Sequence, residues 1–434
     1  MRRHWELVEV SIDNLSHEGR GVGRINGKTV FVFGALPGER VRARILRKRG
    51  RFDEAEVVEV LQASGDRIVP RCAYFGVCGG CSMQHVGEAY QLRHKQGVLI
   101  ELLRHQAGIT PRRIADPIRG PQWGYRRKVR PGVKSVPKKG GVLVGFRERA
   151  KPYIADSARC DILEPRVGDR LLELRALIEN LSISANVPQI EVALGDDCGA
   201  LVVRHLAALG ENDLDRLRCF ASESGLSIYL QSGGPNSIVG TGNEEESLHY
   251  TVDGLSLAFT PTDFTQVNAD INELMVMRAL DYLELEPHDQ VADLFCGIGN
   301  FSLPMARRAG QVRGAEGDER LVDRARMNAL SNGLSNVEFE VMDLARADAI
   351  PALELHKVTK VLLDPPRTGA LILLQSGVFD AVSRLVYVSC NPVTFARDAA
   401  VLIRDHGFNL SETGILDMFP QTAHVESISF FERK

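Results

Sequence analysis

The spacing of hydrophobic and polar positions divides the 434 residues into three stretches. To about residue 65, short runs alternate apolar and polar residues at 5–10, 29–33, 41–45 and 55–60, and the glycine-rich stretch 19–24 is expected to form a turn. Alternation with a period of two is typical of strands that bury one face. The first stretch therefore predicts a small β-barrel.

The second stretch mixes two periodicities. Residues 90–107 and 171–181 repeat apolar positions with the spacing of an amphipathic helix, whereas 189–194 and 201–205 have the pattern of strands. Chemistry-bearing motifs are not evident between 171 and 250. A structural role is expected for the isolated thiols in this region, Cys198 and Cys219. We expect a central α+β domain whose sheet serves as a scaffold.

The third stretch contains short apolar runs, which are typical of strands buried on both faces. A helical pattern between the second and third runs gives a repeated β-α-β order, which predicts a Rossmann-like, doubly wound α/β domain. The expected boundaries are 1–65 for the barrel, 66–263 for the central domain and 264–434 for the sheet domain. The apolar runs lie at 291–294, 312–316, 337–341, 360–363 and 385–388.

Composition narrows the class of protein. Hydrophobic residues make up 44% and charged residues 25%, both ordinary for a globular protein, and the length favours two or three domains. No apolar run approaches the roughly 18 residues of a membrane span. The N-terminal residues 1–6 lack the apolar stretch of a signal peptide. We therefore expect a cytoplasmic protein without a membrane anchor. Its net charge of −3 leaves nucleic-acid binding to local basic patches.

Two basic patches are candidates for such binding. Alternation places Arg40, Arg42 and Arg44 on one side of a strand, a spacing suited to a phosphate backbone. The stretch 123–130, Trp-Gly-Tyr-Arg-Arg-Lys-Val-Arg, interleaves aromatic and basic side chains that can stack on unpaired bases and hold phosphates. The alternatives are a solvated face for the first patch and an exposed basic hairpin for the second.

Three cysteines, Cys72, Cys78 and Cys81, lie within ten residues. This spacing indicates metal ligands, and a cytoplasmic chain argues against disulfides. An iron–sulfur cluster, zinc and unliganded thiols remain open. For a 4Fe-4S cluster the expected fourth ligand is Cys160, because such clusters commonly take three cysteines close together and one distant. The spacing differs from that of radical enzymes, so a structural or RNA-orienting role is expected.

A cofactor signature follows the first strand of the sheet domain. A Gly-x-Gly turn at 297–299 lets the backbone approach a ligand closely, and the next strand ends at Glu316, where an acid can hold ribose hydroxyls. The third strand ends before Asp343. Phe301 and Ser302 stand where the dinucleotide fingerprint has its third glycine. S-adenosylmethionine, which has no phosphate, fits this pattern better than NAD.

The last predicted parallel strand, 385–388, delivers Cys390 into a turn that Asn391-Pro392 ends. Side chains just past the carboxyl ends of such strands line the ligand crevice of an open α/β sheet. Cys390 is therefore a candidate nucleophile. A buried structural thiol is the alternative for a cysteine considered alone.

Several segments together resemble the RNA uracil-C5 methyltransferases, and the first 65 residues resemble a TRAM domain, an OB-like RNA-binding barrel. A TRAM-like barrel combined with four cysteines is similar to the branch that acts on large-subunit ribosomal RNA. The tRNA branch lacks both features, and the other ribosomal branch lacks the barrel. The matching segments are Phe264-Thr-Gln-Val-Asn268, Asp293-Leu-Phe-Cys-Gly-Ile-Gly-Asn-Phe301, Asp364-Pro-Pro-Arg367, Ser389-Cys-Asn-Pro392 and Asp417-Met-Phe-Pro-Gln-Thr-Ala-His-Val-Glu426.

The resemblance implies methylation of uracil C5 in 23S rRNA. Cys390 would add to C6 and Glu426 would later remove the C5 proton. Phe264 would lie near a uracil extruded from opened or single-stranded RNA. Gln266 and Asp364 would lie beside both the methionine moiety of the cofactor and the base, and their division between the two stays open.

The remaining implied contacts are to the cofactor. Glu316 would bind its ribose, Asp343 its adenine end, and Phe295 and Asn300 would line the loop around it. The helical stretch at about 93–124 would pack on the catalytic domain. A monomer without an evident protein partner is expected. The alternatives are the same chemistry on tRNA and a non-catalytic RNA-binding or assembly factor.

Overall fold

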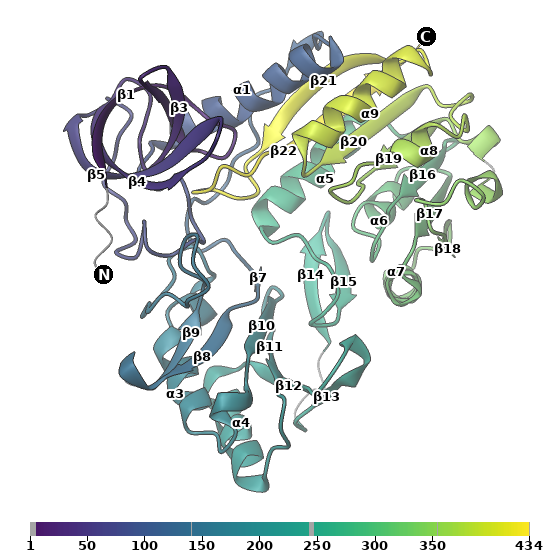
Figure 1. The fold of residues 1–434 in the computed structure, drawn as a ribbon. Helices are drawn as coiled ribbons and strands as arrows, with labels where there is room; N and C mark the ends of the chain where they lie inside the picture. Colours follow the sequence, from purple (N-terminus) through teal and green to yellow (C-terminus); the bar gives the residue numbers. More distant parts are fainter. Residues whose placement is uncertain (1–5, 140, 243–246, 354, 434) are drawn as a thin grey trace. The chain divides into compact units, whose positions relative to one another are not determined.

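The chain forms two compact units, each assembled from segments that are distant in sequence. The computed structural model describes residues 6–139, 141–242, 247–353 and 355–433 (Figure 1). Residues 1–5 lie outside these ranges. They include the start of the first predicted strand and most of the N-terminal stretch 1–6 that was compared with a signal peptide. The first unit comprises Met1–Val98, Phe146–Ala155 and Phe419–Val425, and the second comprises Leu99–Gly145, Asp156–Met418 and Glu426–Lys434.

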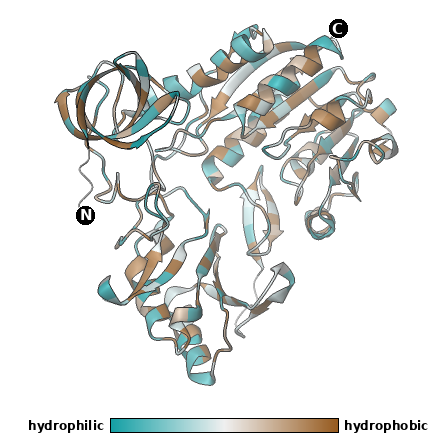
Figure 2. Cartoon of the chain, viewed as in Figure 1, coloured by the Kyte–Doolittle hydropathy of each residue, from teal (hydrophilic) through white to brown (hydrophobic). Residues whose placement is uncertain are grey.

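The first unit contains a closed five-stranded barrel, as the alternating pattern predicts. Alternate apolar side chains such as Val30, Val32 and Val41 fill its interior. Most outward positions are polar or charged, with Leu7 and Val58 among the exposed apolar side chains, and Figure 2 shows this mixture along the barrel strands. Neighbours around the barrel follow the order β1 (Leu7–Leu15), β2 (Gly21–Ile25), β3 (Lys28–Phe33), β5 (Phe52–Gln62) and β4 (Arg40–Lys48).

The expectation that residues 19–24 form a turn is wrong for most of the stretch, because β2 begins at Gly21. Gly19 has the left-handed φ of 74° that a turn requires. Gly23 is needed for a different reason, since a Cβ there would lie 2.3 Å from the carbonyl oxygen of Ser11. Close approach of the neighbouring strand therefore explains this strand glycine.

The scaffold sheet of the second unit follows the order β13-β12-β11-β10-β8-β9, with β7 also paired to β10. The predicted strands and helix of this region are confirmed within a few residues. A separate hairpin, β14 (Leu248–Val252) and β15 (Leu255–Phe259), leads toward the second sheet. The elements are β7 (Lys128–Val129), β8 (Gly132–Val136), β9 (Gly141–Gly145), α2 (Pro165–Gly168), α3 (Leu171–Glu179), β10 (Gln189–Leu194), β11 (Gly199–Arg204), α4 (Glu211–Ser224), β12 (Ser227–Gln231) and β13 (Ile238–Gly240).

The second sheet of this unit has the order β18-β17-β16-β19-β20-β22-β21-β6. The strands β16 to β20 are parallel, and β22 runs antiparallel between β20 and β21. This confirms the Rossmann-like prediction. The chain reverses its direction of winding between β16 and β19, the point where open α/β sheets bind ligands.

In β19 and β20, at the centre of this sheet, a basic residue opens each strand and mainly apolar residues follow (Figure 2). The short strand β6 pairs with β21, so residues 113–114 belong to this sheet. The domain boundaries and the packing of 93–124 stay predictions. The elements are α1 (Glu88–Ala107), which spans both units, β6 (Arg113–Ile114), α5 (Ala269–Leu283), β16 (Gln290–Leu294), α6 (Ser302–Ala306), β17 (Gln311–Glu316), α7 (Glu319–Ser331), β18 (Val337–Val341), β19 (Lys360–Leu363), α8 (Leu371–Leu374), β20 (Arg384–Ser389), α9 (Pro392–Arg404), β21 (Asn409–Leu416) and β22 (Glu426–Glu432).

Candidate active site

A cavity of about 430 Å³ opens at the carboxyl ends of the parallel strands, within the second unit. Its size lies in the range of about 300–1,000 Å³ that small-molecule pockets occupy. The side chains that the sequence assigns to catalysis, substrate and cofactor converge here with one exception, Asp343. Those that line it are Phe264, Gln266, Phe295, Asn300, Glu316, Asp364, Cys390 and Glu426.

The loop after β16 holds an unusual backbone conformation. Phe295 has a φ of 72°, in the left-handed region that a residue with a Cβ rarely adopts. The N–H groups of Phe295 and Cys296 both donate to the carbonyl of Ala315, at 2.9 and 3.1 Å. Gly299 has no room for a side chain, because a Cβ would lie 2.4 Å from Leu303 Cδ1. The Gly-x-Gly turn therefore keeps the backbone close to the cavity.

Glu316, the last residue of β17, is fixed beside this loop. Its carboxylate accepts the N–H groups of Gly297 at 3.2 Å, Gly317 at 2.7 Å and Asp318 at 3.1 Å. Asp343 follows the neighbouring strand, but its side chain is exposed and does not line the cavity. Of the two acids predicted to contact the cofactor here, Glu316 lines the cavity and Asp343 does not.

Asn300 is oriented by two residues that the sequence analysis missed. The hydroxyl of Tyr250 and the amide of Asn272 both donate to Asn300 Oδ1 at 2.9 Å. Asn300 Nδ2 in turn donates to Asn272 Oδ1 at 2.9 Å. Tyr250 comes from the β14–β15 hairpin and Asn272 from α5, so sequence spacing gave no signal for this group. Together they fix which face of the Asn300 amide meets the cavity.

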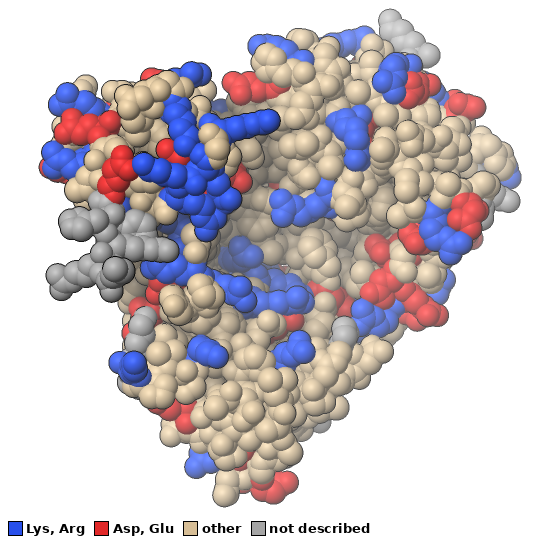
Figure 3. Space-filling model, in the orientation of Figure 1, with Lys and Arg blue, Asp and Glu red and all other residues tan. Residues whose placement is uncertain are grey.

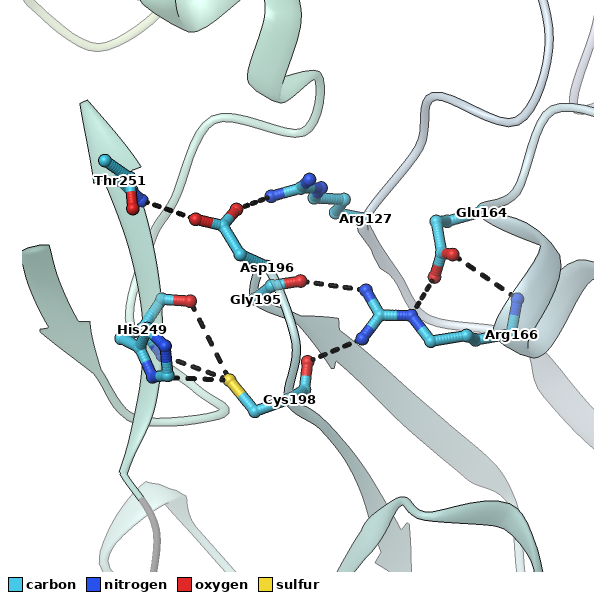
Figure 4. A network of polar contacts seen from close by, with 8 residues as sticks. All are labelled: Arg127, Glu164, Arg166, Gly195, Asp196, Cys198, His249 and Thr251. Atoms are coloured by element: carbon cyan, nitrogen blue, oxygen red, sulfur yellow. Dashed lines mark hydrogen bonds and ion pairs between the residues drawn. The ribbon is translucent and has the colours of Figure 1, made fainter. Parts of the chain in front are cut away.

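Strand β14 carries Tyr250. The residues just before and just after Tyr250 form hydrogen bonds with the scaffold sheet (Figure 4). Asp196 accepts from Arg127 Nη1 at 2.6 Å and from the N–H of Thr251 at 2.8 Å. The N–H of His249 donates to the buried Cys198 sulfur at 3.3 Å. The turn between β10 and β11 therefore holds both neighbours of the tyrosine in place.

The stretch 123–130 is mostly engaged within the unit instead of presenting aromatic rings to bases. Tyr125 is only 4% exposed, so it is not available for stacking on RNA and that part of the expectation is wrong. Lys128 Nζ donates to the carbonyls of Pro261, at 3.0 Å, and Asp263. Burial lowers the pKa of Lys128 to about 8. This lysine thus supports the segment that leads into Phe264, which is 66% exposed.

Cys390 and Glu426 meet because of strand register. Ser389 at the end of β20 is paired with Ser427 in the antiparallel neighbour β22. Cys390 follows this last pair on one side and Glu426 precedes Ser427 on the other, and both residues line the cavity. Asn391 caps α9 by accepting the N–H of Val393 at 3.2 Å, so the cysteine is held between a strand end and a helix start.

Burial and nearby charges disfavour the ionised form of the Cys390 thiol. Burial and the neighbouring Glu426 and Asp364 raise the pKa of the Cys390 thiol to about 11, and Arg367 opposes them. Burial, with repulsion from Asp293, also raises the pKa of the Asp364 carboxyl to about 7. The cavity thus concentrates negative charge, which suits a cationic ligand such as a sulfonium.

The cysteine loop of the first unit is ordered by turns. The N–H of Phe75 donates to the Cys72 carbonyl at 3.1 Å, and the N–H of Gly80 donates to Cys78 Sγ at 3.4 Å. The nearby Cys72 adds to burial in raising the pKa of the Cys78 thiol. Among the described residues, no three His, Cys, Asp or Glu side chains are grouped to hold a metal ion. The metal site therefore stays a prediction.

The arginines of β4 point outward as predicted, but acids of neighbouring strands accompany them. Arg42 Nη1 lies 2.5 Å from Glu59, and Arg44 forms an ion pair with Glu56. Figure 3 shows red side chains among the blue ones on the barrel, next to a larger group of blue side chains. The stretch 40–51 contains no acid, but its strand neighbours offset part of its charge, which sequence alone does not reveal.

The fold and this cavity define a Rossmann-like methyltransferase of the S-adenosylmethionine-dependent class. The solved tRNA (uracil-54, C5)-methyltransferase of Pyrococcus abyssi, in complex with S-adenosyl-L-homocysteine, shares the fold with a TM-score of 0.74 and 22% identity, covering 98% of this chain and 99% of that one. The family model of tRNA (uracil-5-)-methyltransferases matches residues 221–434, and that of the TRAM domain matches residues 2–58.

Relatives match almost the full length. The chain is 52% identical to the 23S rRNA (uracil(1939)-C(5))-methyltransferase RlmD of Alkalilimnicola ehrlichii, over 99% of this chain and 97% of the relative. It is 48% identical to the RlmD of Aromatoleum aromaticum, over 97% of this chain and 99% of the relative. The chain belongs to the RNA uracil-C5 methyltransferase family. Described residues include no helix with the length and apolar character of a membrane span.

Proposed function

We propose that this protein transfers a methyl group from S-adenosylmethionine to C5 of a uridine in 23S rRNA, at the position 1939 for which its relatives are named. The observation that carries the proposal is that Cys390 and Glu426 line one cavity together with Glu316, Asn300 and Asp364. Similarity to the 23S rRNA enzymes over almost the full length, at 52% identity, supports this substrate over tRNA. A ribosomal substrate supports the proposal of a cytoplasmic location.

The proposed reaction begins at Cys390. Its thiolate forms a bond to uracil C6, which moves electron density to C5 as an enolate. C5 then bonds to the methyl carbon of the sulfonium donor, whose sulfur keeps the electron pair of the broken bond and leaves as a neutral thioether. Glu426 removes the proton from C5, and the electrons released re-form the C5–C6 double bond as the C6–S bond breaks. Cys390 is then a thiolate again.

Charge links these steps to cofactor binding. A thiol whose pKa is about 11 is almost fully protonated near neutral pH. A sulfonium and an ammonium group near Asp364 and Glu426 would offset the negative charges that raise this pKa, and Arg367 acts in the same direction. Bound cationic groups would therefore favour the thiolate by offsetting the charge part of this shift, while burial, its largest cause, would remain.

The remaining side chains position the two ligands. Glu316 would accept hydrogen bonds from ribose hydroxyls, and Asp343 would contact the adenine end from outside the present cavity lining. Gln266 and Asp364 lie where both the methionine moiety and the uracil would reach them. The exposed ring of Phe264 is available to stack on a uracil extruded from opened or single-stranded RNA.

A 4Fe-4S cluster held by Cys72, Cys78, Cys81 and Cys160 is the proposed resident group of the cysteine loop. Four partly exposed thiols free of disulfides have the right donor chemistry, and the N–H to Cys78 Sγ bond is of the kind that supports thiolate ligands. No catalytic step needs this group, so its proposed role is structural. Iron and sulfide analysis after anaerobic purification tests it, and zinc alone or no metal would contradict it.

The decisive test of function uses methyl-labelled S-adenosylmethionine with unmodified 23S rRNA and tRNA in parallel, followed by digestion to nucleosides. Label recovered as 5-methyluridine from 23S rRNA alone is the expected result. Label in tRNA would keep the chemistry and replace the substrate. Label in neither, with a loaded and folded protein, would favour an RNA-binding or assembly factor. A monomer that needs no protein partner should perform the reaction with purified components.

A further inference from the structure

The loop before Glu426 is anchored in the first unit. Residues 417–425 connect β21 to β22, and Phe419–Val425 belong to the first unit, whereas Glu426 is the first residue of β22 in the second. The chain therefore leaves one unit immediately before the proposed base. Contacts that hold the 419–425 loop therefore act on the chain one peptide bond before Glu426.

Gln91 of α1 holds the centre of this loop with both ends of its amide. Its Oε1 accepts the N–H of Gln421 at 3.1 Å, and its Nε2 lies 3.2 Å from Gln421 Oε1. The same Nε2 lies within hydrogen-bond distance of the carbonyls of Met83, at 3.1 Å, and Val86, at 2.9 Å. Gln91 is almost fully buried. One helix side chain thus joins the loop to the segment that follows Cys81.

That segment also contacts the loop directly. The N–H groups of Ser82 and Met83 donate to the carbonyl of Gln421 at 3.1 and 3.0 Å. Ser82 Oγ accepts the N–H of Ala423 at 3.0 Å. Ala423 also packs against an apolar cluster that includes Met83. The two residues after the last cysteine of the loop therefore make three hydrogen bonds with the backbone of 419–425.

The conformation that these contacts maintain is one the loop would not adopt alone. Gln421 has a φ of 67°, in the left-handed region that favours glycine, and it is only 5% exposed. Lys95, fully buried one turn along α1, donates from Nζ to the carbonyl of Phe419 at 2.9 Å. A residue keeps a strained backbone conformation of this kind only when the surrounding contacts hold it there.

We propose that Gln91 and Ser82 are positioning residues for the proposed base, acting through Gln421 on Glu426. This inference rests on the proposed function, because it assigns them to the step in which Glu426 removes the C5 proton. Attack by Cys390 and methyl transfer precede that step and involve side chains of the second unit. Loosening the loop should therefore slow resolution of the covalent intermediate more than its formation.

The test is a single-turnover reaction with labelled S-adenosylmethionine and a 23S rRNA fragment. It follows label transfer and the fraction of RNA bound covalently to protein in denaturing gels. In Gln91→Ala we expect at least a tenfold larger adduct fraction than in the unaltered protein, with label transfer within about threefold. Ser82→Ala, an exposed and milder change, should raise the adduct about two- to threefold. Arg93→Ala, on the same helix turn but exposed, is the matched control.

Glu426→Gln is the benchmark, and it separates failure of this inference from failure of the proposed base. Abundant adduct in Glu426→Gln with none above background in Gln91→Ala would overturn the inference alone. If Gln91→Ala does not fold, as judged by its melting transition, Ser82→Ala takes its place in this comparison. Absence of adduct in Glu426→Gln with normal turnover would overturn both assignments. A merely structural role would lower the active fraction without changing the ratio of adduct to product.

Discussion

The active-site cavity and the cysteine loop both hold residues that the sequence marks as chemical, but the chain builds them in different ways. In the cavity, Cys390, Glu426 and Glu316 stand at strand ends whose register places them. In the loop, Cys72 and Cys78 stand on turns, and the described residues show no assembled set of three ligands. Strand pairing positions the residues of the cavity, whereas the loop is expected to depend on a metal.

The sharpest way to test this contrast is to remove the nucleophile. Cys390→Ala should abolish methylation, because the other thiol of the cavity lining, Cys296, is only 4% exposed and burial holds its pKa well above the usual range, so it cannot take the place of Cys390 in the bond to C6. Binding of S-adenosylmethionine, measured by calorimetry, should stay within a few-fold, since the strands still hold Glu316 and Asn300. Substantial residual turnover would remove Cys390 from the mechanism.

The corresponding change in the cysteine loop should act on stability and metal content. Cys72→Ser should lose bound iron and destabilise the protein by about 2 kcal/mol, which lowers Tm by roughly 4–8 °C. Cys219→Ser, at an exposed thiol on α4, is the control and should leave both unchanged. Equal iron content in the two variants would contradict the assignment of Cys72 as a ligand.

The acidity of the cavity predicts a pH dependence. Because the pKa of the Cys390 thiol is raised to about 11, its thiolate fraction should rise about tenfold per pH unit between about pH 7 and pH 10. The rate of iodoacetamide labelling of Cys390 without cofactor, followed by mass spectrometry, should rise in parallel. Glu426→Gln removes one of the charges that raise this pKa, so it should speed labelling at about pH 8. A plateau below about pH 9 would contradict this electrostatic account.

The smallest predicted effect concerns the hydrogen bonds behind the cofactor loop. Tyr250→Phe removes one donor to Asn300, a loss of about 1 kcal/mol, or about fivefold in affinity for S-adenosylmethionine. The KM for the cofactor should rise by this factor while kcat changes little, because Tyr250 orients Asn300 and takes no part in proton transfer. An unchanged KM would show that Asn272 alone orients the amide.

Periodicity was sufficient for most of the fold. The buried strands of the parallel sheet and the alternating strands of the barrel were recognisable because burial imposes a period on the sequence. Gly21 and Gly23 were misread as turn residues, since a glycine required by close packing looks the same in sequence as one required by φ. The β6 strand, Arg113–Ile114, is too short to have a period.

The candidate site was recognisable where motif and strand end coincide, as at Cys390 and Glu316. Tyr250 and Asn272 were missed because they reach Asn300 from a hairpin and a helix, through pairings that depend on tertiary packing. Tyr125 was misjudged because interleaved aromatic and basic residues do not reveal which side chains are buried. The sequence supplies the residue types. In each of these cases it does not reveal which residues a side chain contacts in the folded protein.

The placement of residues 419–425 in the first unit has a consequence for biosynthesis. The ribosome makes the barrel and the start of α1 early, and domains generally fold as they emerge. This unit, however, contains a late-made segment, and the buried amide of Gln91 and the N–H groups of Ser82 and Met83 have no loop to bind until almost the whole chain is made. The nascent first unit therefore stays incomplete through most of synthesis. A chain truncated before residue 419 lacks the 419–425 segment of the first unit, although the barrel of that unit was made first.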